Sequence, residues 1–305
     1  MDKIQQKLLE EVAGIHEVPS GAYSLRINGS IYGKNSSENI EIIKKEDKPG
    51  IDIYIKAGTK NESLHIPVIL SQTGLKELVY NDFHIGEDCD VTIVAGCGIH
   101  NAGAETSEHS GVHSFYLSKN AKVKYIEKHY AEGDGNGKNV MNPCTYAELA
   151  ENSKLEMETV QIKGVDSTKR STKAKVMKNA TIIVNEKIMT HGSQFAETEF
   201  EVDLDGEGSG AHVVSRSVAR DNSKQRFISR VNGNARCTGH TECDAIIMDN
   251  AAVAAIPEIK ALDPDASLIH EAAIGKIAGE QLIKLMTLGL TEKEAEEEIV
   301  NGFLR

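Results

Sequence analysis

Residues 119–123 read KNAKV and residues 178–182 read KNATI, and the pattern that they share recurs along the chain. In each, a polar turn precedes a small residue, a polar residue and an apolar residue. The small residues of six such segments stand at 89, 121, 153, 180, 211 and 235, in steps of 32, 32, 27, 31 and 24. Repeats roughly 20–50 residues apart indicate a solenoid or a propeller, and these steps are short for a four-stranded propeller blade.

The runs between these turns are β-branched and mostly alternate, which predicts strands. They lie at 51–57, 91–96, 123–130, 155–162, 181–188, 211–218 and 226–231. No amphipathic helix separates them, which argues against a βαβ sheet. We therefore predict an all-β core folded as a right-handed parallel β-helix, in which Asn or Asp adopts the αL corner and the small residue packs inside the turn. A β-sandwich is the alternative.

Helical patterns flank this core. Apolar residues at 4, 8, 9 and 12 share one helix face, and Gly14 ends the helix. Beyond Ala272 the pattern becomes helical again, and Thr291 with Glu294 forms a capping box. The predicted organisation is an N-terminal helix in 1–20, the β-helix core in 21–262 and a short C-terminal helical segment in 263–305.

Composition and motifs exclude several functions. The net charge is -12 without a basic patch, which argues against nucleic acid as a partner. No apolar run is long enough to cross a membrane. Five cysteines without an export signal indicate reduced thiols in the cytoplasm. The glycine-rich segments 133–138 and 206–210 depart from a Walker A loop and are expected to be plain loops. Aromatic residues are too scarce, at 5%, to favour a polysaccharide-degrading β-helix. We do not expect an enzyme.

Soft metal ligands gather near the end of the chain. Cys237, His240 and Cys243 lie within seven residues, and His270 stands beside Glu271. In a strand the two thiols would share a face but lie roughly 20 Å apart, so they could meet only through a bend or through a second subunit. Such an incomplete set suits a transient cluster or a site shared across an interface. The alternative is that both are ordinary core cysteines.

A second group of candidates lies upstream. Cys97 stands between two glycines, with His100 three residues on and His109 and His113 later in the chain. A metal or thiol role is expected there, with Cys97 and His100 as secondary candidates for a metal site. Cys89 and Cys144 are interpreted as structural.

The end of the chain resembles the C-terminal signature of the SufB/SufD family of iron–sulfur cluster assembly scaffolds. The resemblance lies in three segments: TGHTECDAIIMDN (238–250), AIPEI (255–259) and LIHEAAIG to the final GFL (268–304). The resemblance is continuous over about 70 residues, and the upstream repeats agree with the parallel β-helix of that family. The chain is short for the family and looks like a compact, single-type form that would pair with itself.

The resemblance implies roles for individual residues. Cys243 stands at the cluster-assembly cysteine of the SufB branch, His270 at an interface histidine, and Glu271 at the adjoining SufB-type glutamate. Ile269 replaces a second acid. Cys237 has no counterpart, and its candidacy rests on proximity.

The resemblance also implies a function and partners. It implies a homodimeric scaffold that assembles a transient [4Fe–4S] or related cluster and passes it to recipient apo-proteins. A SufC-type ABC ATPase would dock on the helical pair within 274–304 and supply ATP hydrolysis. The alternative is a β-helix module that regulates or positions the ATPase without holding a cluster.

Overall fold

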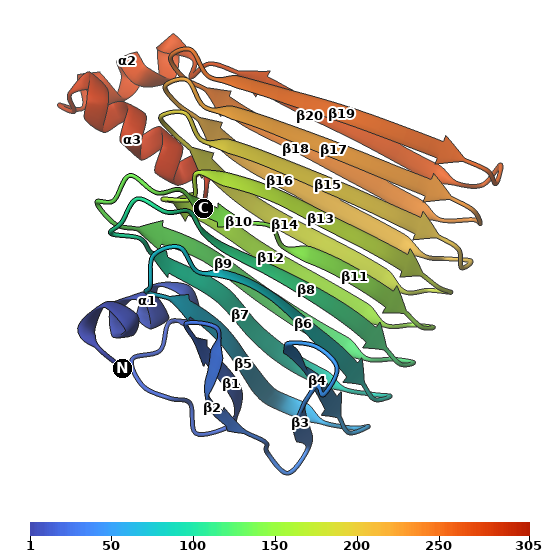
Figure 1. Ribbon diagram of the computed structural model, residues 1–305. Helices are drawn as coiled ribbons and strands as arrows, with labels where there is room; N and C mark the ends of the chain where they lie inside the picture. The colour runs from blue at the N-terminus through green and yellow to red at the C-terminus, as the bar shows by residue number, and fades with distance from the viewer.

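The computed structural model describes residues 1–305 and consists of two stacked sheets that run the length of the molecule (Figure 1). Each coil of the chain contributes one strand to each sheet, and successive coils pair in parallel. The strands of the first sheet, here sheet A, are β1 (Ala22–Ile27), β2 (Ser30–Asn35), β5 (Lys60–Leu70), β7 (Asp90–His100), β9 (Lys122–Glu132), β12 (Lys154–Lys163), β14 (Thr181–Thr190), β16 (Gly210–Ala219), β18 (Thr238–Ile247) and β20 (Ser267–Gly275).

The second sheet, sheet B, faces sheet A across the core. Its strands are β3 (Ile40–Lys44), β4 (Gly50–Ile55), β6 (Lys76–Ile85), β8 (Ser107–Leu117), β10 (Asn139–Met141), β11 (Cys144–Leu149), β13 (Ser167–Val176), β15 (Phe195–Leu204), β17 (Lys224–Gly233) and β19 (Ala252–Ala261). Only β1–β2 and β3–β4 pair antiparallel. The prediction of an all-β parallel β-helix with short terminal helices is therefore confirmed.

An Asx ladder turns the chain from one sheet into the next. Asp88, Asn120, Asn152 and Asn179 all adopt positive φ angles between 54° and 60°. Asn152 Nδ2 donates to Asn120 Oδ1 at 3.1 Å, and Asn120 Nδ2 donates to Asp88 Oδ1 at 2.9 Å. Asn and Asp tolerate this left-handed conformation better than other side chains. The predicted αL corners are thus present.

Two of the six predicted corner positions are wrong by two residues. Cys89, Ala121, Ser153 and Ala180 pack inside the turns as expected. In the next two coils, however, the strand register aligns Thr181 with Gly210 and then with Thr238, so the equivalent residues are 209 and 237, not 211 and 235. The predicted positions are wrong because the Asx residue is replaced by Gly208 in the first of these coils and by Arg236, whose φ is not positive, in the second. Cys237 consequently occupies a core corner position like that of Cys89.

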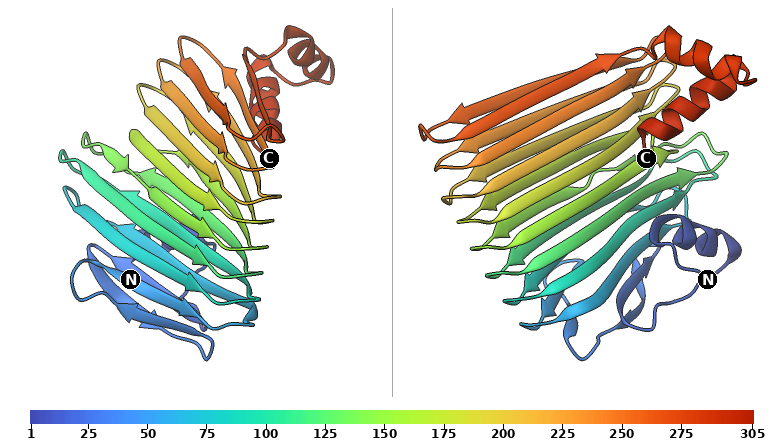
Figure 2. Two further views of the ribbon diagram at one scale, coloured as in Figure 1. Left: turned by 90° about the vertical axis from the view of Figure 1, so that its right-hand side faces the viewer. Right: turned by 180° about the vertical axis from the view of Figure 1, so that it is seen from behind.

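The first helix, α1 (Lys3–Ala13), covers sheet A beside its early coils (Figure 2). Leu8, Leu9 and Val12 are buried on one face, and Gly14 ends the helix at φ 66°. A Cβ on Gly96 would lie 2.7 Å from the backbone oxygen of Val12. The glycines beside Cys97 therefore admit the helix, whereas Cys97 points to the opposite, inner face.

The last two helices lie beside the final coils. They are α2 (Gly279–Thr287) and α3 (Glu292–Phe303), and the capping box at Thr291 is present. Residues 267–275 form β20, so the strands continue beyond residue 262, where the helical segment was expected to begin. Ile274 fits both a strand and a helix pattern, and pairing with β18 decides between them. None of the helices is long and apolar enough to cross a membrane.

Candidate functional site

The last two coils place the predicted ligands on two different faces. Strand residues alternate sides, so Cys243 of β18 points into the solenoid while Glu242 points outward. His270 of β20 aligns with Thr241 and shares the inner face, and its neighbour Glu271 lies on the outer face. The structure thus brings Cys243 and His270 to the same side of sheet A and directs Glu271 away from them.

Cys243 is enclosed at 1% exposure. It lines a small cavity together with Glu186, Ser215 and Thr198. Burial, followed by the charges of Glu186 and Asp244, raises the pKa of the thiol to about 12. Iron binding would have to displace the proton, because the thiolate is the ligand.

His270 is oriented by the strand beside it. Its Nδ1 lies 2.7 Å from Thr241 Oγ1, and its Nε2 is buried without a hydrogen-bond partner. Burial, followed by the charge of His240, lowers the pKa of the imidazole. A neutral imidazole with one nitrogen held and the other free is the form that binds a metal.

Cys237 lies apart from this pair. It precedes β18 at the corner, six residues before Cys243, which corresponds to roughly 20 Å along a strand. Its thiol is 3% exposed and burial raises its pKa. A Cβ on Gly233 would lie 3.0 Å from its sulfur, so the thiol fills the corner. Within one chain the two thiols do not meet.

The solenoid ends openly at this site. β19 and β20 are the final strands of their sheets and each pairs on one side only. Apolar side chains remain exposed along them, with Ile256 and Ile259 at 41% and Ile269 at 51%. An unpaired strand edge can pair with another chain. His270 therefore lies in the coil that a second subunit could cover.

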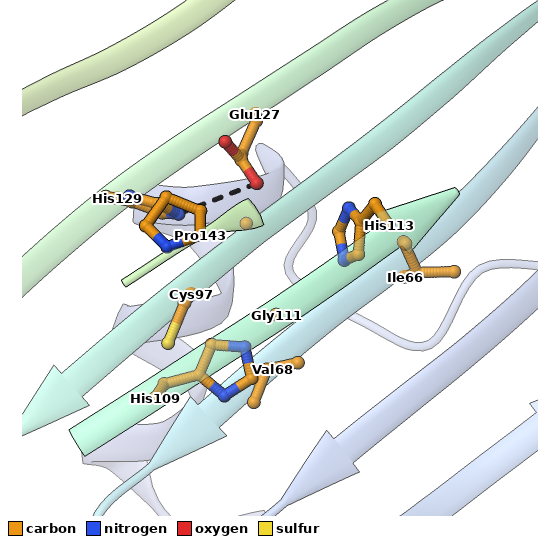
Figure 3. A pocket seen from close by; sticks show the side chains of 10 residues that line it. Ile66, Val68, Cys97, His109, Gly111, His113, Glu127, His129 and Pro143 are labelled. Atoms are coloured by element: carbon orange, nitrogen blue, oxygen red, sulfur yellow. Dashed lines mark ion pairs between the residues drawn. The ribbon is translucent and has the colours of Figure 1, made fainter. Parts of the chain in front are cut away.

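The secondary candidates, Cys97 and His100, do not come together. His100 lies on the outer face of β7, 3.7 Å from Glu132. Cys97 instead faces an internal cavity with His109, His113 and His129 (Figure 3). Burial, with the charges of Glu77 and Glu127, raises the pKa of this thiol well above its usual range.

Sequence reasoning missed a buried ionic network that connects these cavities. Arg170 donates from Nη1 to Glu127 and its Nε lies 3.6 Å from Glu186. Burial opposes ionisation, but the charge of Arg170 keeps the pKa of Glu127 well below its usual range. Burial raises the pKa of Glu186. Period-two alternation could have revealed this network, since Glu127 shares the inner positions of the 123–130 run.

Comparison with known proteins agrees with this architecture. Residues 78–303 match the family model described as SUF system FeS cluster assembly, SufBD core domain. An iron–sulfur cluster assembly SufBD family protein of Archaeoglobus fulgidus is 30% identical over 281 residues, which cover 90% of this chain and 73% of that protein. One from Methanocaldococcus jannaschii is 28% identical, covering 86% and 83%. The iron–sulfur cluster assembly protein SufB of Bacillus subtilis is 38% identical over 96 residues, which are 30% of this chain and 21% of SufB.

Proposed function

The chain belongs to the SufBD family of iron–sulfur cluster assembly proteins, and we propose that it is a homodimeric scaffold on which a cluster is built and then released. The observation that carries the proposal is the placement of Cys243 and His270 on the inner face of the last two coils, at an open strand edge. One thiolate and one imidazole are too few ligands for a stable cluster. A second copy doubles them.

The dimer would form through β19 and β20. Pairing of these edges in two copies would satisfy exposed backbone groups and cover Ile256 and Ile269. A two-fold axis there makes the contact self-complementary. A charged substitution, Ile269→Lys, should then yield monomers in sedimentation analysis, and an unchanged dimer would argue against this interface.

A SufC-type ABC ATPase would dock on α2. This helix buries no residue; its Ile283 is 63% exposed, and Leu288, which caps its C-terminal end, is 73% exposed. The neighbouring helix α3 packs Val300 against a cluster that includes Val218 and Ile246. Because Ile246 and Cys243 share β18, movement of the helices on ATP binding would act on the strand that holds the thiol.

The cargo is a [4Fe–4S] or related cluster, delivered to apo-proteins in the cytoplasm. All five cysteines are free, which suits a reducing compartment. The Cys243 thiolate would bind iron or carry sulfur, and the His270 imidazole would add a weaker ligand that eases release. Cys237 and Glu271 stay sequence-based predictions for this role.

Anaerobic reconstitution with iron and sulfide tests the scaffold role. Visible and Mössbauer spectra should show a cluster on the wild type and lose it in Cys243→Ser. Cys144→Ser is the matched control, since Cys144 is a half-buried thiol on sheet B. Cys237→Ser and Glu271→Gln measure the two remaining candidates. A colourless wild-type protein that still binds the ATPase would instead support the regulatory module.

A further inference from the structure

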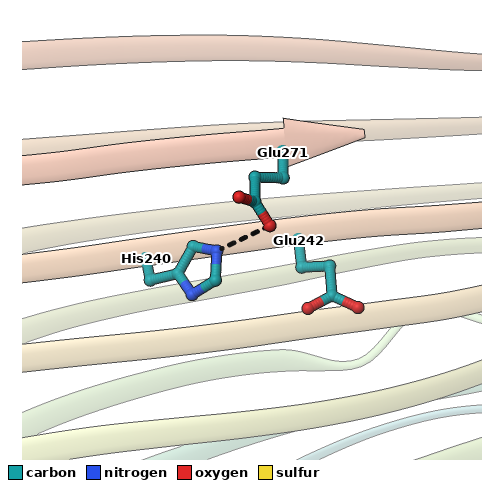
Figure 4. Close-up of side chains that lie close together, drawn as sticks. All are labelled: His240, Glu242 and Glu271. Atoms are coloured by element: carbon teal, nitrogen blue, oxygen red, sulfur yellow. Dashed lines mark ion pairs between the residues drawn. The ribbon is translucent and has the colours of Figure 1, made fainter. Parts of the chain in front are cut away.

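A group of three metal-binding side chains lies on the outer face of sheet A. His240 and Glu242 project from β18 and Glu271 from β20 (Figure 4). One potential ligand atom from each lies within 4.8 Å of the other two. His240 Nε2 is already 3.4 Å from Glu271 Oε2. This group is separate from Cys243 and His270, which face the inside of the solenoid.

The group is unfavourable without a cation. Glu242 and Glu271 are register partners on the parallel strands β18 and β20, so their like charges repel each other across neighbouring strands. Asp244 adds a third acid on this face, and Arg216 stands opposite Asp244 in the register. His240 Nε2 is buried without a hydrogen-bond partner. A bound cation would relieve the repulsion between the carboxylates and would engage this nitrogen.

The donor set selects the kind of ion. One imidazole nitrogen and two carboxylate oxygens suit Fe²⁺, Mn²⁺ or Zn²⁺, whereas soft ions prefer thiolates. Bonds of about 2.0–2.2 Å place neighbouring ligand atoms roughly 3–3.5 Å apart. The His240–Glu271 pair already meets this spacing, and Glu271 is 65% exposed and free to rotate.

We propose that His240, Glu242 and Glu271 form a binding site for a divalent transition-metal ion on the outside of the solenoid. The ion that suits this protein is Fe²⁺, held on the opposite side of the strand that carries Cys243. That use of the site, as a source of iron for the cluster, rests on the proposed function, but the binding of the ion does not.

The chain offers a matched control. His16 Nδ1 and Glu10 Oε2 form a second histidine–carboxylate pair at the same 3.4 Å distance, with a more exposed imidazole. Neither residue belongs to a group of three ligands. If a single His–Glu pair were sufficient for binding, the two places would bind equally.

Anaerobic calorimetric titration of the purified protein with Co²⁺, and then with Fe²⁺, tests the site. We expect one ion per chain. His240→Ala and Glu242→Gln should each weaken binding by more than about tenfold, since loss of even an indirect partner of a metal costs 10–100-fold. His16→Ala should bind like the wild type. Melting curves of the variants show whether they are folded.

Two results would overturn the site. One is wild-type affinity in both His240→Ala and Glu242→Gln. The other is a thiolate-to-cobalt absorption band that disappears in Cys243→Ser, because the ion would then be on the inner face. The scaffold role is judged separately: Cys243→Ser should lose the cluster yet keep the Co²⁺ affinity of the wild type.

Discussion

His113 inside the solenoid should make the folded state less stable as the pH falls below neutrality. Its Nδ1 lies 2.7 Å from Tyr125 Oη, and its Nε2 lies 3.3 Å from Asn81 Nδ2. Tyr125 donates its own hydroxyl proton to Glu127 at 2.9 Å, so its oxygen accepts the Nδ1–H proton. The Asn81 amide then donates to Nε2. These bonds suit a neutral imidazole.

The magnitude follows from the pKa of this ring. Burial lowers the pKa of His113 from 6.5 to about 4. Above pH 6.5 the ring is neutral in both states and contributes no pH dependence. Below pH 6.5 His113 binds a proton in the unfolded chain but stays neutral in the folded chain. The free energy of unfolding therefore falls until the pH reaches about 4. A gap of about 2.5 pKa units corresponds to a loss of about 3 kcal/mol.

Urea unfolding followed by circular dichroism from pH 7.5 to 4 measures this loss. His113→Gln should be less stable at pH 7.5, but the free-energy difference from the wild type should shrink by about 3 kcal/mol on acidification. His16→Gln, which makes the same change at a 75% exposed ring, is the control. A constant difference between His113→Gln and the wild type across this range would show that His113 is not the source of the pH dependence.

Three further perturbations test the scaffold. Arg170→Met leaves two buried glutamates without their shared cation and should lower the free energy of unfolding in urea by about 3–5 kcal/mol. Arg226→Met breaks an exposed ion pair and should lower it by less than about 1 kcal/mol. Gly96→Ala pushes a Cβ against the backbone of α1, so it should lower the free energy of unfolding by about 1–3 kcal/mol and expose the helix to limited proteolysis. Gly275→Ala places its Cβ in open space and should leave the cleavage pattern unchanged. Asn152→Ala should lower the thermal midpoint by an amount equivalent to about 1–2 kcal/mol, because a φ of 60° is unfavourable for alanine. If Asn152→Gly lowers the midpoint equally, the stability comes from the side-chain ladder and not from the backbone conformation.

Short-range sequence patterns were sufficient to predict the strands that form the coils. Strand alternation and the Asx–small corner motif are short-range properties, so runs such as 155–162 and 181–188 were predicted as strands before any pairing was known. The slip at 211 and 235 shows the limit. Where Gly208 and Arg236 replace the Asx residue, only pairing with the previous coil sets the register.

The site predicted from the sequence combined residues that the folded chain holds apart. Proximity in sequence grouped Cys237 with Cys243 and His270 with Glu271. In a strand, residues that are several positions apart lie far apart along the axis, and neighbouring side chains point to opposite faces. Cys237 and Cys243 therefore lie far apart, and His270 and Glu271 lie on opposite faces.

Residues close in the chain are enough to predict the parallel coils, four of the six corners and the terminal helices. Which side chains meet depends on how one coil packs on the next. Cys243 with Glu186, Cys97 with three histidines and Glu271 with His240 come from different coils. Their contacts depend on the register between coils, which is set by packing across the whole solenoid and which no single segment encodes.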